Sequence, residues 1–241
     1  MGPKGRRRLR TLATAFAQAH PHIADADAII AAGRVLVDGI AVRNPSTLVR
    51  PGASIAIRRD PRLRGETKLE AALAAFDLRV TGRIALDVGA AAGGFTLALL
   101  RAGALRVYAV DAGHGQLLGS LRQDPRVRNL EGTNLGELDR TKVPESIEIV
   151  TIDVSYLALA LAAAQLDRVQ IAAGADLVAL VKPQFELGLA EQPDDPDRLR
   201  EAQSRAAAGF AAAGWIVRET IESPVRGARG AVEFLLHGSR P

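Results

Sequence analysis

The sequence contains no cysteine, and this absence excludes several classes of protein. Its 241 residues offer no thiol for a disulfide scaffold, a Cys-ligated zinc or iron–sulfur site, or a cysteine nucleophile. The four histidines lack the spacing of metal ligands, so we expect no metal site. No apolar run reaches membrane-spanning length, and no secretory signal follows the basic N-terminus. These absences predict a cytoplasmic protein without a membrane partner.

Lysine is also scarce. Of the 31 basic residues, 27 are arginines and four are lysines, at positions 4, 68, 142 and 182. Arginine cannot lose its proton in a protein, whereas a buried lysine can. The few lysines are therefore positions at which a removable proton or a compact charge could matter.

Positive charge is concentrated in the first quarter of the chain. Residues 1–64 carry 12 basic and 4 acidic side chains, whereas residues 65–241 carry 19 basic and 23 acidic ones. Such an asymmetry is typical of a solvated basic arm, or of a nucleic-acid-binding module joined to a near-neutral catalytic domain.

The first sixty residues predict a small unit of helices followed by a hairpin. The spacing of apolar residues and the stop at Gly33 predict two helices, and an Asp-Gly turn predicts the hairpin. The helices are expected at 6–19 and 24–32, and the strands at 34–39, 40–42 and 54–58. We divide the chain into a module at 1–60, a linker at 61–67 and a second domain at 68–241.

Strands and helices alternate in the second domain. A sequence of capping-box form at Thr67–Glu70 predicts the start of a helix that runs through Phe76. Further strands are expected at 84–89, 107–111, 127–130, 147–153, 175–182, 215–219 and 232–237, and helices at 95–102, 116–121, 157–169 and 197–213. The central strands are continuous apolar runs, which predicts an α/β fold with a parallel sheet covered on both faces.

A glycine-rich turn follows the first strand of this domain. Glycines at 89, 93 and 94 would let the backbone approach a ligand and direct helix N–H groups toward it. The next strand ends at Asp111, where a carboxylate can bind ribose hydroxyls. These features predict a nucleoside-containing ligand. The glycine spacing differs from the dinucleotide pattern, which argues against a nicotinamide-dependent oxidoreductase on the same fold.

Four segments of the second domain resemble the TlyA family, whose members are labelled both hemolysins and ribosomal RNA 2′-O-methyltransferases. They are residues 86–96, 107–116, 152–156 and 181–186, and the tail at 223–236 resembles the family's last strands. The resemblance implies a Rossmann-like, FtsJ-like methyltransferase domain that uses S-adenosylmethionine. Residues 29–39 resemble the RNA-binding module named after small-subunit ribosomal protein four, which implies a small N-terminal α+β domain that contacts ribosomal RNA or ribosomal subunits.

The resemblance also implies the site residues. The Lys-Asp-Lys-Glu set of FtsJ-type enzymes falls on Lys68, Asp153, Lys182 and Glu233, the last on a late strand. A ribose hydroxyl must lose its proton as it attacks a methyl group. A lysine accepts that proton only as a neutral amine, a form that burial and a nearby cation such as Lys68 favour. The implied cofactor-binding residues are Asp87, Gly89, Gly93, Gly94, Phe95, Asp111, Asn134 and Asp153.

RNA contact is expected to depend on arginines in the basic part of the chain. These are Arg6, Arg7, Arg8, Arg10, Arg34, Arg43, Arg58, Arg59, Arg62 and Arg64. Aromatic residues make up only 4% of the chain, which favours recognition of RNA shape and backbone over base stacking. The segment 187–197 is acidic where family members usually carry a basic, glycine-rich stretch. An RNA-binding protein with an inactive methyltransferase domain is therefore one alternative. A lytic protein is another, although no basic amphipathic helix supports it.

Overall fold

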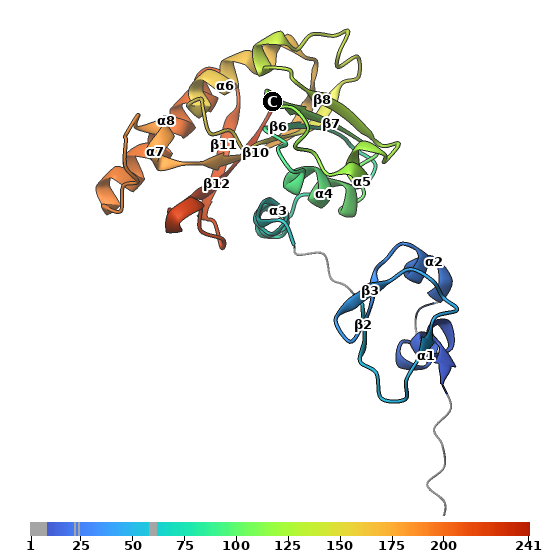
Figure 1. The fold of residues 1–241 in the computed structure, drawn as a ribbon. Coiled ribbons are helices and arrows are strands. Elements are labelled where there is room, and N and C mark those ends of the chain that lie inside the picture. Colours follow the sequence, from blue (N-terminus) through green and yellow to red (C-terminus); the bar gives the residue numbers. More distant parts are fainter. Residues whose placement is uncertain (1–8, 22, 24, 58–61) are drawn as a thin grey trace, which may run out of the picture. The chain divides into compact units, whose positions relative to one another are not determined.

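The computed structural model describes residues 9–21, 23, 25–57 and 62–241. The chain divides into two compact units, Met1–Arg62 and Leu63–Pro241 (Figure 1).

The smaller unit packs two short helices against very short strands. Its elements are β1 (Arg10–Thr11), α1 (Leu12–Ala19), α2 (Ala26–Ala31), β2 (Val35–Val37), β3 (Ile40–Val42), β4 (Leu48–Val49) and β5 (Ile55–Ile57). An antiparallel sheet has the order β3-β2-β5, and β1 pairs separately with β4. The buried core consists of Leu12, Phe16, Ile30, Val35 and Val49.

The first predicted helix begins later than expected. The prediction of a helix over 6–19 is wrong at its start, because Arg10 and Thr11 pair as a strand with β4. The Thr11 hydroxyl then accepts a hydrogen bond from the N–H of Thr14 and caps the helix at Leu12. Residues 6–8 lie outside the described residues.

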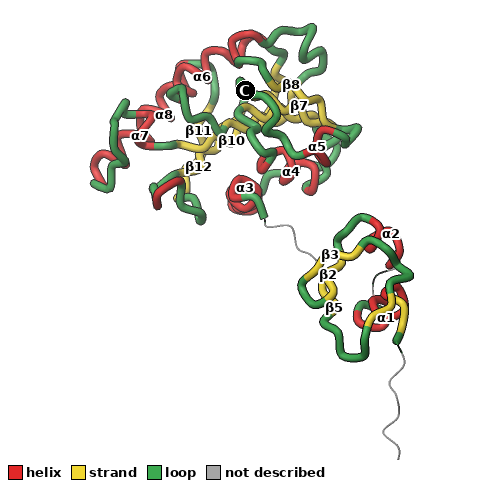
Figure 2. The backbone as a smooth tube through the Cα atoms, viewed as in Figure 1, coloured by secondary structure: helices red, strands yellow, loops and turns green. Residues whose placement is uncertain are grey.

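The larger unit is a seven-stranded sheet between two helical layers. Its helices are α3 (Arg64–Ala75), α4 (Gly94–Arg101), α5 (Gly119–Arg122), α6 (Leu159–Gln165), α7 (Pro183–Glu186) and α8 (Pro196–Ala212). Its strands are β6 (Ile84–Val88), β7 (Arg106–Asp111), β8 (Val127–Glu131), β9 (Ile147–Ile152), β10 (Ile171–Val181), β11 (Ile216–Glu222) and β12 (Phe234–Ser239). Helices α6 and α8 cover one face, and α3, α4 and α5 cover the other (Figure 2). The α/β prediction is confirmed.

The sheet is mixed rather than wholly parallel. Its order is β11-β12-β10-β9-β6-β7-β8, and the five strands from β10 to β8 are parallel as predicted. Strand β12 inserts antiparallel between β10 and β11. It begins at Phe234, so the prediction that Glu233 lies on the strand is wrong, and this residue immediately precedes it.

Because of tertiary contacts, two helices begin at residues other than those predicted. Helix α3 begins at Arg64, so residues 64–67 belong to the helix and not to a linker, and Thr67 does not cap it. The added turn is held by Gly65, which packs against Gly94 and Phe95 at the start of α4. Helix α5 is shorter than the predicted 116–121, because the N–H groups of residues 116 and 117 donate to the carboxylate of Glu131 instead.

Gly89 brings the ends of β6 and β9 together. Its φ of +83° is in the left-handed region, and a Cβ on this residue would overlap the carbonyl oxygen of Asp153. The N–H of Asp153 donates to the carbonyl of Val88 at 2.9 Å. A residue without a side chain is therefore required where these two strands end.

Gly89→Ala should destabilise the protein much more than Gly82→Ala. Gly82, just before β6, has a φ of +78° but open space around its Cβ position. Both variants incur about 1–2 kcal/mol for the left-handed backbone, and only Gly89→Ala adds the collision with Asp153. Chemical denaturation measures the two free energies of unfolding. Equal losses would contradict the close approach.

Candidate active site

A cavity of about 320 Å³ lies in the larger unit and is lined by all four residues of the predicted Lys-Asp-Lys-Glu set. Lys68 comes from α3, Asp153 follows β9, Lys182 follows β10, and Glu233 precedes β12. The parallel strands β9 and β10 end at one edge of the sheet, where ligands bind in open α/β folds. The structure therefore brings together four residues that are widely separated in the sequence.

The four side chains form two ion pairs of different character. Lys68 Nζ donates to Glu233 Oε2 at 2.5 Å, and both side chains are less than 10% exposed. Lys182 Nζ lies 2.6 Å from Asp153 Oδ1, with the two side chains 15% and 23% exposed. Removing one partner of a buried pair leaves an uncompensated charge, so Lys68 and Glu233 depend on each other. The Lys182 pair is the more accessible of the two.

Ser155 is a second partner of Lys182 that the sequence analysis missed. Lys182 Nζ donates to Ser155 Oγ at 2.6 Å. The Asp153 contact is as short but lacks the alignment of a hydrogen bond. In the sequence, Ser155 lies two residues after Asp153, inside the segment 152–156 that resembles the TlyA family.

Arg64, which we expect to contact RNA, is exposed and also holds a loop of the larger unit. Its Nη2 donates to the carbonyl groups of Arg226 and Gly227, the latter at 2.8 Å. Gln192 Nε2 donates to the carbonyl of Ala228, in the same loop, at 2.8 Å. Both side chains line the cavity, so they hold the loop that leads to Glu233.

Asp111 joins two loops at the carboxyl edge of the sheet. Its carboxylate accepts hydrogen bonds from the N–H groups of Ala91 at 2.8 Å and Gly113 at 2.7 Å. Each oxygen retains capacity for another donor, as binding a ribose hydroxyl requires. Gly93, with a φ of +94°, precedes α4 in the same turn. Asn134 follows β8 and caps a short 3-10 helix at Leu135–Glu137.

Three of the residues predicted to bind the cofactor also make contacts within the fold. Asp87 is fully buried and accepts hydrogen bonds from the hydroxyls of Thr96 at 2.6 Å and Thr151 at 2.9 Å. Phe95 is 3% exposed within the core, and Gly94 packs on α3. Both side chains are buried, and the assignment of Asp87 and Phe95 to cofactor binding stays a prediction.

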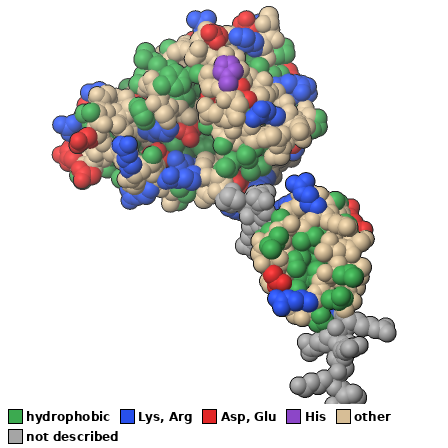
Figure 3. Space-filling view, in the orientation of Figure 1, with side chains coloured by type: hydrophobic (Ala, Val, Ile, Leu, Met, Phe, Trp, Pro, Cys, Tyr) green, Lys and Arg blue, Asp and Glu red, His purple; other side chains and the backbone are tan. Residues whose placement is uncertain are grey.

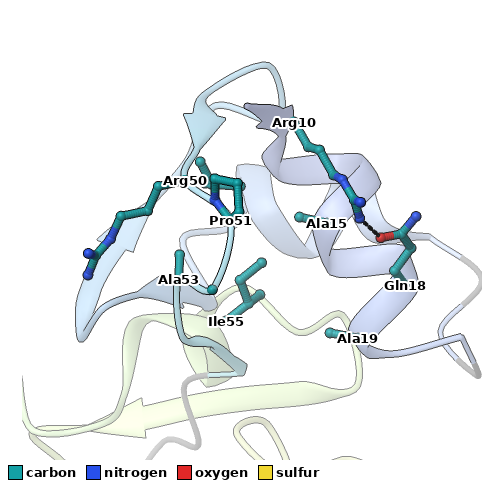
Figure 4. Close-up of a pocket in the computed structure, with 10 residues that line it drawn as sticks. Arg10, Ala15, Gln18, Ala19, Arg50, Pro51, Ala53 and Ile55 are labelled. Atoms are coloured by element: carbon teal, nitrogen blue, oxygen red, sulfur yellow. Dashed lines mark hydrogen bonds between the residues drawn. The ribbon is translucent and has the colours of Figure 1, made fainter. Parts of the chain in front are cut away.

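The predicted RNA-binding arginines of the smaller unit lie on its surface. Arg10, Arg34 and Arg43 are exposed, as is Arg62 at the end of the unit. A groove of about 660 Å³ lies in the smaller unit. Figure 4 shows Arg10, one of the residues that line it, directed toward Gln18, with which it forms a hydrogen bond. Arg6, Arg7, Arg8, Arg58 and Arg59 lie outside the described residues.

The described residues contain neither a metal-binding cluster nor a helix that could span a membrane. In residues 9–21, 23, 25–57 and 62–241, no three His, Asp or Glu side chains are arranged to hold a metal ion. No helix in that part of the chain has the length and apolar character needed to cross a membrane.

Comparison with known proteins decides the family. Residues 61–240 match the family model of the FtsJ-like methyltransferases. The chain is 39% identical over 219 residues to the 16S/23S rRNA (cytidine-2′-O)-methyltransferase TlyA of Mycobacterium tuberculosis, a match that covers 86% of this chain and 81% of that relative. The chain belongs to the TlyA family of FtsJ-like methyltransferases. This membership excludes the oxidoreductase alternative.

Other members of the TlyA family carry a different label. Hemolysin A of Brachyspira hyodysenteriae is 33% identical over 224 residues, covering 87% of this chain and 90% of that relative. A solved structure titled as a hemolysin from Streptococcus thermophilus superposes with a TM-score of 0.70 at 31% identity, covering 97% of this chain and 89% of that one.

The ionisation of Asp87 should make stability depend on pH. Burial raises the pKa of this carboxyl from 3.8 to about 6. Between these values the folded state retains a proton that the unfolded state has lost, so stability falls as pH rises from about 4 to 6. The loss is about 3 kcal/mol at most, and Asp87→Asn should remove it.

Chemical denaturation at pH 4 and pH 7 tests this expectation. The wild type should lose stability relative to Asp87→Asn between the two values, whereas Asp194→Asn, on the exposed acidic segment, should follow the wild type. An identical pH dependence in wild type and Asp87→Asn would contradict the buried, proton-retaining carboxyl.

Proposed function

We propose that this chain transfers a methyl group from S-adenosylmethionine to a ribose 2′-hydroxyl of ribosomal RNA. The observation that carries the proposal is the cavity in which Lys182 and Asp153 pair beside Lys68 and Glu233. The name of the Mycobacterium tuberculosis relative, a ribosomal RNA (cytidine-2′-O)-methyltransferase, supports the choice of substrate.

The turn after β6 and the carboxylate after β7 fit a cofactor that contains a ribose. Gly89 and Gly93 leave two positions of that turn without side chains, and Asp111 offers acceptors for hydroxyl groups. We assign cofactor contact to these residues and to Asn134. When bound, S-adenosylmethionine supplies an already electrophilic methyl group, so the remaining task of the chain is to orient the ribose hydroxyl and remove its proton.

Lys182 is the residue proposed to take that proton. As a neutral amine, Nζ would accept the proton of the ribose hydroxyl as its oxygen bonds to the methyl group, and S-adenosylhomocysteine would leave with the electron pair of the broken S–CH3 bond. Asp153, 2.6 Å away, stabilises the positive charge that Lys182 gains. The Lys68–Glu233 pair adds a second cation whose position is fixed by burial. The rest of the acceleration comes from aligning the reacting atoms.

We further propose that the smaller unit is an RNA-binding module. Its exposed arginines at 10, 34 and 43 are suited to phosphate contact, which would make binding weaken steeply with added salt. Acidic side chains gather instead at the end of the larger unit near α7 and α8 (Figure 3), where Glu191, Asp194, Asp195 and Asp197 are exposed. RNA should therefore avoid that end. A ribosomal RNA substrate also places the proposed activity in the cytoplasm.

Lys182→Arg should abolish methyl transfer while leaving cofactor binding intact. Arginine keeps the positive charge but cannot become a neutral base, so we expect transfer to fall at least about 100-fold. Transfer of labelled methyl to ribosomal subunits from a strain lacking the enzyme measures the rate, and calorimetry measures S-adenosylmethionine binding.

Lys142→Arg is the matched control, because Lys142 lies on the surface and donates to the carbonyl of Glu137. It should transfer methyl at the wild-type rate. Near-normal transfer by Lys182→Arg would refute the base assignment. Failure of the wild type itself to methylate any subunit would favour the inactive-domain alternative.

A further inference from the structure

We propose that Ser155 is a positioning residue for Lys182, one that directs the amine toward the substrate hydroxyl in both of its protonation states. The inference rests on the proposed function, since it concerns the same site. It assigns a task to a side chain outside the Lys-Asp-Lys-Glu set.

The two partners of Lys182 differ in how they can act on Nζ: one through its charge and the other through a directional hydrogen bond. Asp153 brings negative charge to within 2.6 Å of Nζ, but the contact lacks hydrogen-bond alignment. The hydrogen bond itself goes to Ser155 Oγ, also at 2.6 Å. Charge attraction depends weakly on angle, whereas a hydrogen bond weakens steeply when it is bent. Asp153 therefore sets the charge of the environment, and Ser155 sets the direction of the amine.

A hydroxyl is suited to a base that changes its protonation state. It can accept a hydrogen bond from the ammonium or the neutral amine, and it can also donate one. A carboxylate in the same place would accept only, and its charge would favour the ammonium form. Ser155 can thus hold Nζ without adding negative charge, which would favour the ammonium form of Lys182 over the neutral amine.

The other charged groups around the cavity do not duplicate this contact. Lys68 is paired with Glu233, and Arg64 is bonded to backbone carbonyls of the loop at 226–227. Ser155 itself is exposed, so its substitution removes no core packing. The catalytic effect of a variant can then be separated from an effect on folding.

Three variants at one position test the proposal. Ser155→Ala should lower kcat about 10-fold or more, because one hydrogen bond to a charged group is lost, with KM for ribosomal subunits unchanged. Ser155→Thr retains the hydroxyl and should restore most of the rate. Ser155→Asp should move the acidic limb of the kcat–pH profile to higher pH, because the added carboxylate favours the ammonium form.

The matched control is Ser204→Ala, at an exposed serine of α8 away from the cavity, which should leave rate and pH profile unchanged. Thermal unfolding should show all variants folded. If the wild type transfers methyl and Ser155→Ala matches its kcat and pH profile, the positioning role is wrong and the proposed function stands. A reduced kcat that Ser155→Thr does not restore, or an unmoved profile in Ser155→Asp, also overturns the role. If the wild type transfers no methyl, the proposed function fails and this inference fails with it.

Discussion

Parallel pairing of β9 with β6 and β10 is the constraint on which the site depends. Ile152 lies opposite Val88 on one side and Ala179 on the other, so residues 89, 153 and 182 leave the sheet at the same edge. Lys182 is two residues further along its strand than the position level with Asp153, and its long side chain spans that offset. Gly89 allows the backbones to meet there. The remaining helices and strands hold this edge in place by burying both faces of the sheet.

The ionisable side chains at and near the site differ in their exposure to solvent. Asp87 lies deepest, with two threonine hydroxyls as its partners. Among the residues of the site, the side chains of the Lys68–Glu233 pair are also buried, and those of Lys182 and Asp153 are more exposed. Buried ionic groups are retained only where partners compensate their desolvation. Lys182 and Asp153 form the more accessible pair, and Lys182 is the residue proposed to take up a proton from the substrate. The exposure of this pair therefore agrees with its proposed role.

The sequence predicted strands and the strand-end residues better than helix starts and side-chain roles. Apolar runs identify buried parallel strands directly, and Asp153 and Lys182 were placed correctly because they end such runs. The start of α3 at Arg64 depends on glycine contacts with α4, which no local pattern encodes. The charge of Arg64 predicts RNA contact, but no local pattern shows that its Nη2 also donates to carbonyl groups 162 and 163 residues away. Ser155 was missed because its role depends on the side chain of Lys182.

The insertion of β12 has a consequence for the order in which the molecule can assemble. This strand is made after β11, yet it lies between β10 and β11 and follows the residue that neutralises Lys68. The parallel part of the sheet can form as the chain leaves the ribosome, but Lys68 has no Glu233 until a further 165 residues have been synthesised. Closing a contact over 165 residues is also slow. The cavity is thus completed late, and a nascent chain gains its catalytic centre only when the rest of the larger unit is already in place.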